Sequence, residues 1–346
     1  MTREDSLDLL AQFCAAHSPG GYDAEIDPLL LAQFERLGLE AERDAAGNLA
    51  WIRPGGDPAR RLVVTAHKDE LGVIVKRVEY DGRLQVRPVG SAWPWAYGEG
   101  PMDLLGTDAT VPGVLSFGSR HTSPESAGYA LRSEALTWEA AWIETFLSPA
   151  ELHARGVSVG TKAVVSRDRK RPTLMGDHVG AFNLDDKAAL VVFFDILEQL
   201  GDFETARQLV FAVTANEEQG GVGASWLTAR QPAEILLALE VAPVADEYQT
   251  LCDERPVVLL QDGWGIYDER LAHELGVAAG YLDLGLQYAC VANYGSDATL
   301  AARRGHVARP ACLGFPAQNT HGYEIAHLGS LHNMARLVVE WLRNFG

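Results

Sequence analysis

The chain has 346 residues, 47% of them hydrophobic, and a formal net charge of −18, because 47 Asp and Glu residues outnumber 29 Lys and Arg residues. The length suggests two domains, and the composition is that of a globular protein, so disorder is not the default expectation. The acidic balance excludes the basic surfaces that hold nucleic acid or anionic lipid, but it is compatible with divalent cations.

The cysteines and the N-terminal residues exclude two further classes. No two of the four cysteines have the C-x-x-C spacing, so we expect free thiols rather than a thiolate zinc site. Residues 1–6 lack the basic and apolar run of a signal peptide, and the longest apolar stretch, 188–194, is too short to span a bilayer. We therefore expect a cytoplasmic protein without a membrane partner.

The first 72 residues predict helices and strands in turn. Apolar residues at helical spacing predict helices over 7–14 and 27–37, the second ending at Gly38. Short apolar runs predict strands at 49–52 and 61–66, with a turn over 54–58 between them.

Residues 73–162 have a different character. Short apolar runs at 73–78, 83–89, 108–115 and 160–166 are separated by glycines and prolines. This pattern is typical of a small β-rich domain, and one short helix is predicted near 149–155.

From residue 186 onward helices and strands alternate again. This alternation predicts an α/β fold, a layered sheet with helices on both faces, built from 1–72 and 163–346 and interrupted by an inserted domain of 73–162. The predicted elements are a helix at 187–199, a strand at 208–214, a helix at 222–228, a strand at 234–239, a helix at 270–277, a strand at 287–291, a helix at 297–303, a strand at 309–315 and a helix at 325–343.

Residues of metal-ligand type stand at the ends of these elements. In open α/β sheets, ligands bind beyond the carboxyl ends of the strands. Histidine and carboxylate side chains without cysteine are the ligands that zinc, manganese or cobalt accept. The residues in question are His67 and Asp69 after the strand 61–66, Glu217 and Glu218 after 208–214, Glu240 at the end of 234–239, Asp185 and Asp186 before the helix at 187, and His321 after 309–315.

Each motif also has a purely structural interpretation. His67 can be a buried core histidine, Glu217 and Glu218 a solvated loop pair, and Asp186 the N-cap of the following helix. Glu240 is harder to dismiss, because it ends an apolar run where an unpaired carboxylate is costly. The combination of five such sites favours a metal centre, with one glutamate of the adjacent pair free to take a proton from water.

Five segments, in order, resemble the M42 family of metallo-aminopeptidases, the glutamyl and deblocking aminopeptidases, some of whose relatives carry an older endoglucanase or cellulase M label. They are Ala66–Gly72, Phe182–Lys187, Asn216–Ala224, Gly295–Ala298 and His321–Glu324. The resemblance spans essentially the whole chain.

The resemblance implies a zinc-peptidase-like (phosphorylase/hydrolase-like) fold and a dinuclear site. It implies two divalent metal ions per subunit, zinc first and cobalt or manganese as alternatives. His67 would bind one ion with Asp69 as its orienting residue, Asp185 would bridge both ions, Glu218 and His321 would complete the second ion's shell, and Glu217 would be the general base. Glu240 stands where the family has Asp, and Lys187 where it has Arg.

The resemblance further implies peptide substrates and a homo-oligomer, a dimer building up to a dodecamer through the inserted domain. Trp93, Trp95, Tyr97 and Met102 are suitable interface anchors, or else core residues of that domain. Other functions stay open: a metal-dependent deacylase or amidohydrolase on acylated amino acids, a non-catalytic assembly module, or, less compatible with two histidines, a glycosidase.

Overall fold

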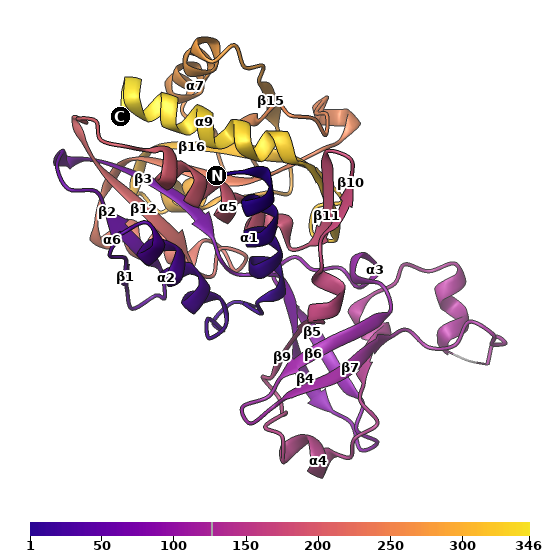
Figure 1. The fold of residues 1–346 in the computed structure, drawn as a ribbon. Coiled ribbons are helices and arrows are strands. Elements are labelled where there is room, and N and C mark those ends of the chain that lie inside the picture. The colour runs from indigo at the N-terminus through magenta and orange to yellow at the C-terminus, as the bar shows by residue number, and fades with distance from the viewer. Residues whose placement is uncertain (126) are drawn as a thin grey trace.

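The computed structural model describes residues 1–125 and 127–346. They form a large α/β body and a smaller β-barrel that projects from it (Figure 1). In the described part of the chain, no helix is long and apolar enough to cross a membrane.

The α/β body is built around four neighbouring parallel strands. In spatial order these are β12 (Arg207–Thr214), β3 (Asp57–His67), β13 (Ala233–Pro243) and β16 (Val307–Gln318). Because parallel strands run in one direction, their carboxyl ends lie at the same edge of the sheet.

Shorter strands flank this parallel centre. On one side lie β2 (Leu49–Ile52) and β1 (Glu42–Arg43). On the other side β17 (Tyr323–His327), β11 (His178–Phe182) and β10 (Thr173–Met175) follow in antiparallel order, and β14 (Val257–Gln261) pairs with both β16 and β15 (Gln287–Cys290).

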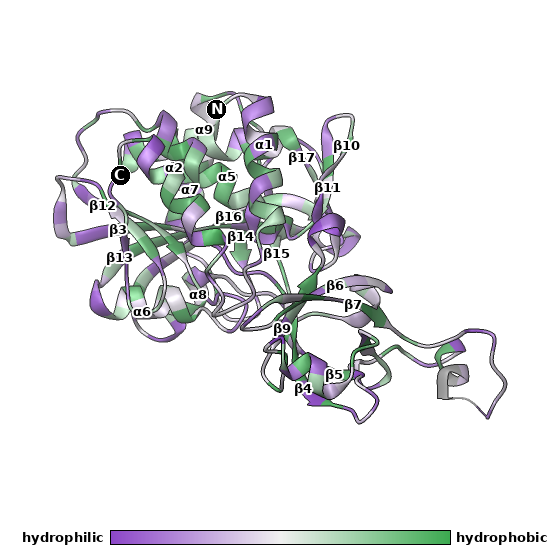
Figure 2. Ribbon diagram, turned by 60° about the horizontal axis from the view of Figure 1, so that its bottom comes forward, coloured by the Kyte–Doolittle hydropathy of each residue, from purple (hydrophilic) through white to green (hydrophobic). Residues whose placement is uncertain are grey.

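Helices cover both faces of the sheet, as predicted from the alternation of elements (Figure 2). One face carries α6 (Val222–Arg230) and α8 (Asp297–Arg303). The opposite face carries α1 (Arg3–Ala15), α2 (Ile26–Arg36), α5 (Leu184–Gln199), α7 (Glu269–Tyr281) and α9 (Leu328–Phe345).

The barrel closes on itself and has a hydrophobic core of its own. Alternation of buried and exposed residues along its strands places side chains such as Leu104, Val111 and Ile143 inside. Around the barrel the strands are β4 (Gly72–Val78), β5 (Leu84–Val89), β8 (Trp142–Glu144), β7 (Thr110–Ser116), β6 (Gly100–Leu105) and β9 (Lys162–Val165), and the short helices are α3 (Pro94–Tyr97) and α4 (Pro149–His153).

Two predicted boundaries are wrong. The last helix begins at Leu328 instead of 325, because residues 323–327 form β17 and pair with β11 and β16. The predicted turn over 54–58 ends early, since β3 already begins at Asp57.

The sequence did not predict the strands β6, β8, β10, β11 and β14. Short strands gain their stability from neighbours that are distant in sequence, so local patterns do not reveal them.

Candidate active site

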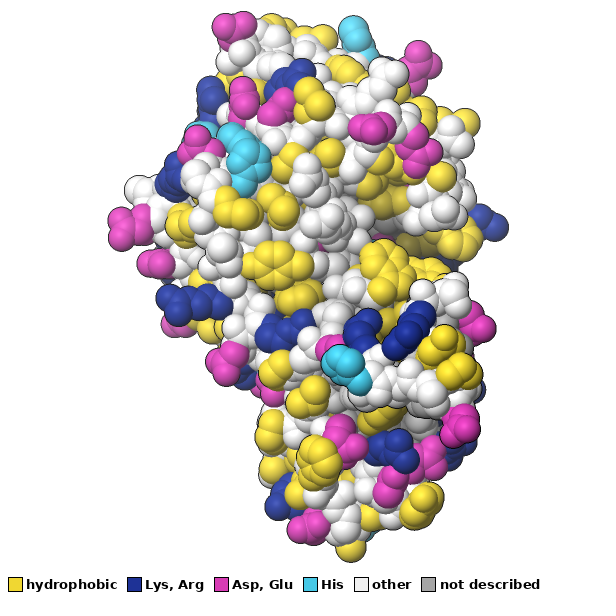
Figure 3. All heavy atoms as spheres, turned by 90° about the vertical axis from the view of Figure 1, so that its right-hand side faces the viewer, with side chains coloured by type: hydrophobic (Ala, Val, Ile, Leu, Met, Phe, Trp, Pro, Cys, Tyr) yellow, Lys and Arg dark blue, Asp and Glu magenta, His cyan; other side chains and the backbone are white. Residues whose placement is uncertain are grey.

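A cavity of about 450 Å³ lies at the carboxyl edge of the parallel strands. The side of the molecule where the α/β body meets the barrel carries many hydrophobic side chains around the junction (Figure 3). Six of the seven predicted site residues line the cavity, and the seventh, Asp69, is buried behind them. The six are His67, Asp185, Glu217, Glu218, Glu240 and His321.

The first group of ligand-type atoms surrounds His67, the last residue of β3. Its Nε2 lies 3.0 Å from Asp185 Oδ1 and 3.8 Å from Glu240 Oε1. Together with Asp186, these residues bring one ligand atom each to within 4.8 Å of one another, and all four are buried.

The second group shares Asp185 with the first. His321 Nε2 lies 3.4 Å from Asp185 Oδ2 and 3.9 Å from Glu218 Oε1. The two oxygens of Asp185 therefore face two different histidines, which is the arrangement that a bridging carboxylate needs.

Asp69 is held in a different way from the one expected. His67 Nδ1 lies 3.1 Å from the backbone carbonyl oxygen of Asp69, and 3.6 Å from its carboxylate. The carboxylate instead accepts the backbone N–H groups of Glu217 at 3.0 Å and Glu218 at 3.2 Å. Asp69 thus orients the imidazole through its backbone and the glutamate pair through its side chain.

The interpretation of Asp186 as a helix cap is wrong. Asn183 is the N-cap of α5 with a φ of 66°, and Asp185 and Asp186 have non-helical backbone angles inside the assigned helix. The side chain of Asp186 turns back and accepts the N–H of His67 at 2.9 Å, which places it in the first ligand group.

Glu324 supports both groups, although it was not singled out from the sequence. Its Oε2 accepts the N–H of Asp185 at 2.9 Å and its Oε1 accepts the N–H of His321 at 3.0 Å. The carboxylate of Glu324 therefore fixes the backbone of Asp185 relative to the backbone of His321. Its position at the end of the segment 321–324 is the signal that points to it.

Lys187 lies outside the cavity lining. Its Nζ donates to Ser18 Oγ at 2.5 Å and to the carbonyl of Lys68, and burial lowers its pKa to about 8. Lys187, at the position where the resemblance implies an arginine, therefore lies behind the site and outside the described lining that a substrate would meet.

Burial raises the pKa values of Glu217 and Glu240 well above the usual carboxyl range and that of Glu218 to about 7. Burial by itself lowers the pKa of His321, but Glu218 and Asp185 outweigh it and raise this pKa to about 11. Burial likewise opposes ionisation of Asp185, yet hydrogen bonds from His321 and His67 hold its pKa below the usual value. In the absence of bound cations, the side chains of this site therefore tend to retain protons, because there is too little positive charge to balance the carboxylates.

Divalent cations fit this donor set. Glu218 Oε1 and Asp186 Oδ1 are buried without a hydrogen-bond partner, and no Lys or Arg is among the described residues that line the cavity. Such oxygens are costly unless a cation meets them. Imidazole nitrogen and carboxylate oxygen together are the ligands that zinc, cobalt and manganese accept.

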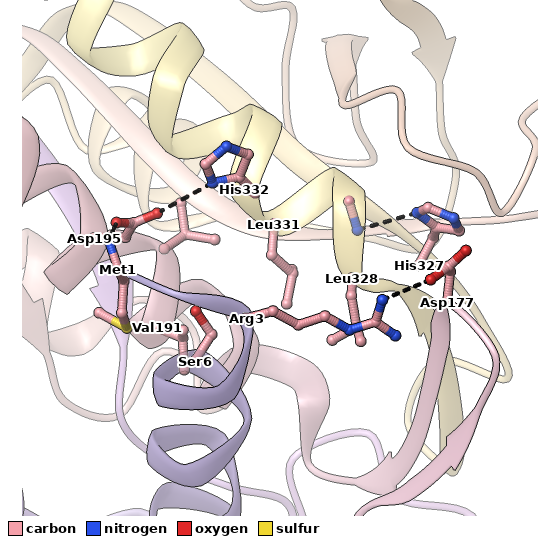
Figure 4. A pocket seen from close by; sticks show the side chains of 12 residues that line it. Met1, Arg3, Ser6, Asp177, Val191, Asp195, His327, Leu328, Leu331 and His332 are labelled. Atoms are coloured by element: carbon pink, nitrogen blue, oxygen red, sulfur yellow. Dashed lines mark hydrogen bonds and ion pairs between the residues drawn. The ribbon is translucent and has the colours of Figure 1, made fainter.

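A second cavity, of about 350 Å³, lies between α1, α5 and the start of α9 (Figure 4). Its charged groups already have partners: Arg3 Nη1 lies 2.7 Å from Asp177, and the N-terminal nitrogen lies 2.8 Å from Asp195. With a mainly apolar lining and satisfied charges, it offers no comparable chemistry.

Comparisons with known proteins found a matching family and similar sequences. A family model described as M42 glutamyl aminopeptidase matches residues 47–337. The putative aminopeptidase YhfE of Bacillus subtilis (strain 168) is 26% identical over 350 residues, which cover 98% of this chain and 97% of the relative.

Solved structures confirm the fold. The TET aminopeptidase from the marine sediment archaeon Thaumarchaeota archaeon SCGC AB-539-E09 matches with a TM-score of 0.89 at 21% identity, over 99% of this chain and 97% of that one. The Pyrococcus horikoshii TET1 peptidase, described as able to assemble into a tetrahedron or a large octahedral shell, matches with a TM-score of 0.86 at 22% identity over 99% of both chains.

Proposed function

The chain belongs to the family of M42 glutamyl aminopeptidases, and from this premise we propose that it is a metal-dependent aminopeptidase that hydrolyses N-terminal residues from peptides. The observation that carries the proposal is the pair of ligand groups that share Asp185 in an open cavity. A cavity at the carboxyl edge of the sheet can receive the end of a peptide, and both groups face it.

Two divalent cations, zinc first and cobalt or manganese as alternatives, would occupy this site. His67, Asp185 and Glu240 would hold one, and Asp185, Glu218 and His321 the other. Bound there, they would polarise the scissile carbonyl and lower the pKa of water.

Glu217 is the residue we assign as general base. It lines the cavity but belongs to neither ligand group, and its backbone is held by Asp69. Its raised pKa suits a carboxylate that accepts a proton from the attacking water and passes it to the leaving amine.

The charge of the cavity favours a free N-terminal amine over an acylated one. Besides Glu324, seven buried or nearly buried carboxylates surround the site, more than two divalent cations would neutralise, and this surplus attracts an ammonium group. An N-acylated amino acid offers only its own carboxylate, which would find no Lys or Arg in the described lining. The seven are Asp69, Asp185, Asp186, Glu217, Glu218, Glu240 and Asp297. Aminopeptidase activity is therefore preferred to deacylase activity.

The test combines elemental analysis with two substrates. We expect about two ions per chain, hydrolysis of leucine p-nitroanilide and no hydrolysis of its N-acetyl derivative. Release of acetate from the N-acetyl derivative, with its anilide bond left intact, would support the deacylase. Bound ions without any hydrolysis would support a non-catalytic assembly module.

The assigned base is tested by Glu217→Gln, which keeps the shape of the side chain and removes its basicity. We expect kcat to fall by about 10² to 10⁴-fold with the ion content unchanged. Glu247→Gln, exposed on the short 3-10 helix Asp246–Tyr248, is the matched control and keeps full activity. A metal-loaded Glu217→Gln protein with normal kcat would refute the mechanism.

We also propose that residues 73–162 form the dimerisation domain of a homo-oligomer that builds up to a dodecamer. Assembly of the TET1 relative supports this proposal. Trp93 and Trp95 are 56% and 64% exposed and suit an interface, whereas Tyr97 and Met102 lie in the barrel core.

A further inference from the structure

The cavity has a further wall, formed by the loops after β14 and β15 and by α8, to which the mechanism above assigns no role. We propose that this wall receives the side chain of the substrate's first residue and selects a neutral apolar one, such as leucine or phenylalanine, with Trp264 as a specificity-determining residue. The inference rests on the proposed aminopeptidase function and names its substrate class. The wall is made by Trp264, Tyr294 and Leu300, with Gly220, Gly263, Gly295 and Asn293 between them.

The wall carries no formal charge. The hydroxyl of Tyr294 donates to the carbonyl of Val241 at 2.7 Å, which leaves the ring rather than the polar group for the cavity. A glutamate side chain would find no Lys or Arg among the described lining residues, and burying it unpaired is costly. A lysine side chain would meet, among the described lining residues, only Glu217 and the carboxylates of the ligand groups, where it competes with the cations and with the substrate's own ammonium group.

The position of Trp264 is set by its surroundings. Asp262 Oδ1 accepts the N–H groups of Trp264 at 2.8 Å and Gly265 at 2.9 Å, while Asp262 Oδ2 accepts the hydroxyl of Thr299 on α8. A Cβ atom at Gly295 would come within 2.4 Å of the Trp264 ring, so the indole lies directly on this glycine. A wall that is held before substrate arrives loses little entropy on binding.

Two arginines stand behind the wall and are not among its lining residues. The guanidinium of Arg303 lies 4.8 Å from the centre of the Trp264 ring, and Arg304 donates to the carbonyl of Gly220 at 2.9 Å. The first contact is a cation–π interaction that holds the indole.

The experiment uses the metal-loaded protein and two independent measurements. The first is kcat/KM on dipeptides X-Ala with X as Leu, Phe, Ala, Glu or Lys. The second is calorimetric binding of the α-hydroxamates of leucine, alanine, glutamate and lysine, which requires no turnover. We expect the Leu and Phe probes to exceed the Ala, Glu and Lys probes by at least about 10-fold, since a buried apolar side chain gives this much discrimination.

Trp264→Ala should reduce the preference for Leu over Ala by about 10-fold, and Trp264→Phe should restore most of it. Trp226→Ala is the matched control: this tryptophan of α6 also has an arginine, Arg230, over its ring, but it lies outside the cavity lining. The control should leave both the preference and the basal activity unchanged.

The outcomes separate the inference from the function beneath it. Hydrolysis with Glu or Lys preferred, or an unchanged preference in Trp264→Ala, would overturn the inference and leave the aminopeptidase standing. Tight binding of leucine hydroxamate without hydrolysis of any dipeptide would support the wall and refute the aminopeptidase.

Discussion

Asp185 is the residue on which the site depends most, because its two oxygens face two histidines that come from distant parts of the chain. Its own position depends on Glu324, which accepts its backbone N–H. Removal of Asp185 would separate the two ligand groups, whereas removal of Glu240 would weaken only the first.

At the residue scale, cation binding should release protons. Without ions, the pKa of Glu218 is about 7 and that of His321 about 11, so at pH 7 His321 holds a proton and Glu218 is about half protonated, and a cation must displace these protons. Zinc affinity should therefore rise as the pH is increased from 6 to 8. Calorimetry in two buffers with different ionisation enthalpies measures the protons released, and identical heats in the two buffers would contradict the prediction. His321→Asn should release about one proton fewer.

The candidate site residues lie where the strands of the sheet end. His67 ends β3, Glu240 lies near the end of β13, and the loop after β12 carries Glu217 and Glu218. The parallel order of these three strands brings His67 to the same edge of the sheet as Glu217 and Glu240, although more than a hundred residues separate it from either in the sequence. The start of α5, with its non-helical backbone, adds Asp185.

At the element scale, Asp268 should stabilise α7 in two separable ways. It caps the helix by accepting the N–H of Leu271 at 2.9 Å, and its carboxylate binds Arg309 of β16 at 2.8 Å. The Arg309 hydrogen bond holds the pKa of Asp268 below its usual value. Because the pKa of Asp268 is lowered in the folded state, its ionised form stabilises the fold at pH values above the unfolded pKa, about 3.9. This stabilisation is lost as the pH falls through the pKa of the folded state.

Asp268→Asn keeps a good capping group and removes the charge, so it should cost under about 1 kcal/mol at pH 7. The cost should be smaller at pH 3, because the ion pair weakens as the pH falls toward the lowered pKa of Asp268. Asp268→Ala removes the cap as well and should cost about 1 kcal/mol more at both pH values. Urea denaturation at pH 7 and pH 3 measures the difference. A constant cost of Asp268→Asn across this range would show that the ion pair contributes nothing.

On the scale of the whole molecule, the barrel and the α/β body meet at the candidate site. Ser91, in the segment between β5 and α3, lines the cavity, and its carbonyl lies 3.3 Å from His321 Nδ1. Any assembly made through the barrel would therefore act close to the second ligand group.

The proposed dimerisation domain leads to a prediction about assembly. Replacing both Trp93 and Trp95 by Ser should weaken self-association by at least about 30-fold, since buried interface tryptophans commonly contribute 2 kcal/mol or more. Light scattering should show the mass falling toward that of one chain. Tyr281→Ser, at a position 63% exposed on α7, is the control and should leave the mass unchanged. An unchanged mass in the double variant would place the interface elsewhere.

Local sequence determined much of this protein. Hydrophobic periodicity was sufficient for most helices and for the long buried strands, because burial of an apolar face follows directly from spacing. The short motifs at strand ends were sufficient to nominate the residues from His67 to His321, since chain order and the parallel fold together place strand ends at one edge.

Only the tertiary structure decided the rest. The roles of Asp186 and Glu324, the backbone contact of Asp69 and the short strands such as β6 and β17 depend on partners that are distant in sequence. Closure of the barrel decides which of the four candidate interface anchors are exposed. Trp93 and Trp95 are exposed, whereas Tyr97 and Met102 are buried. Such contacts join residues that are distant in the sequence and come together only when the chain folds. The local spacing of residues therefore does not predict them.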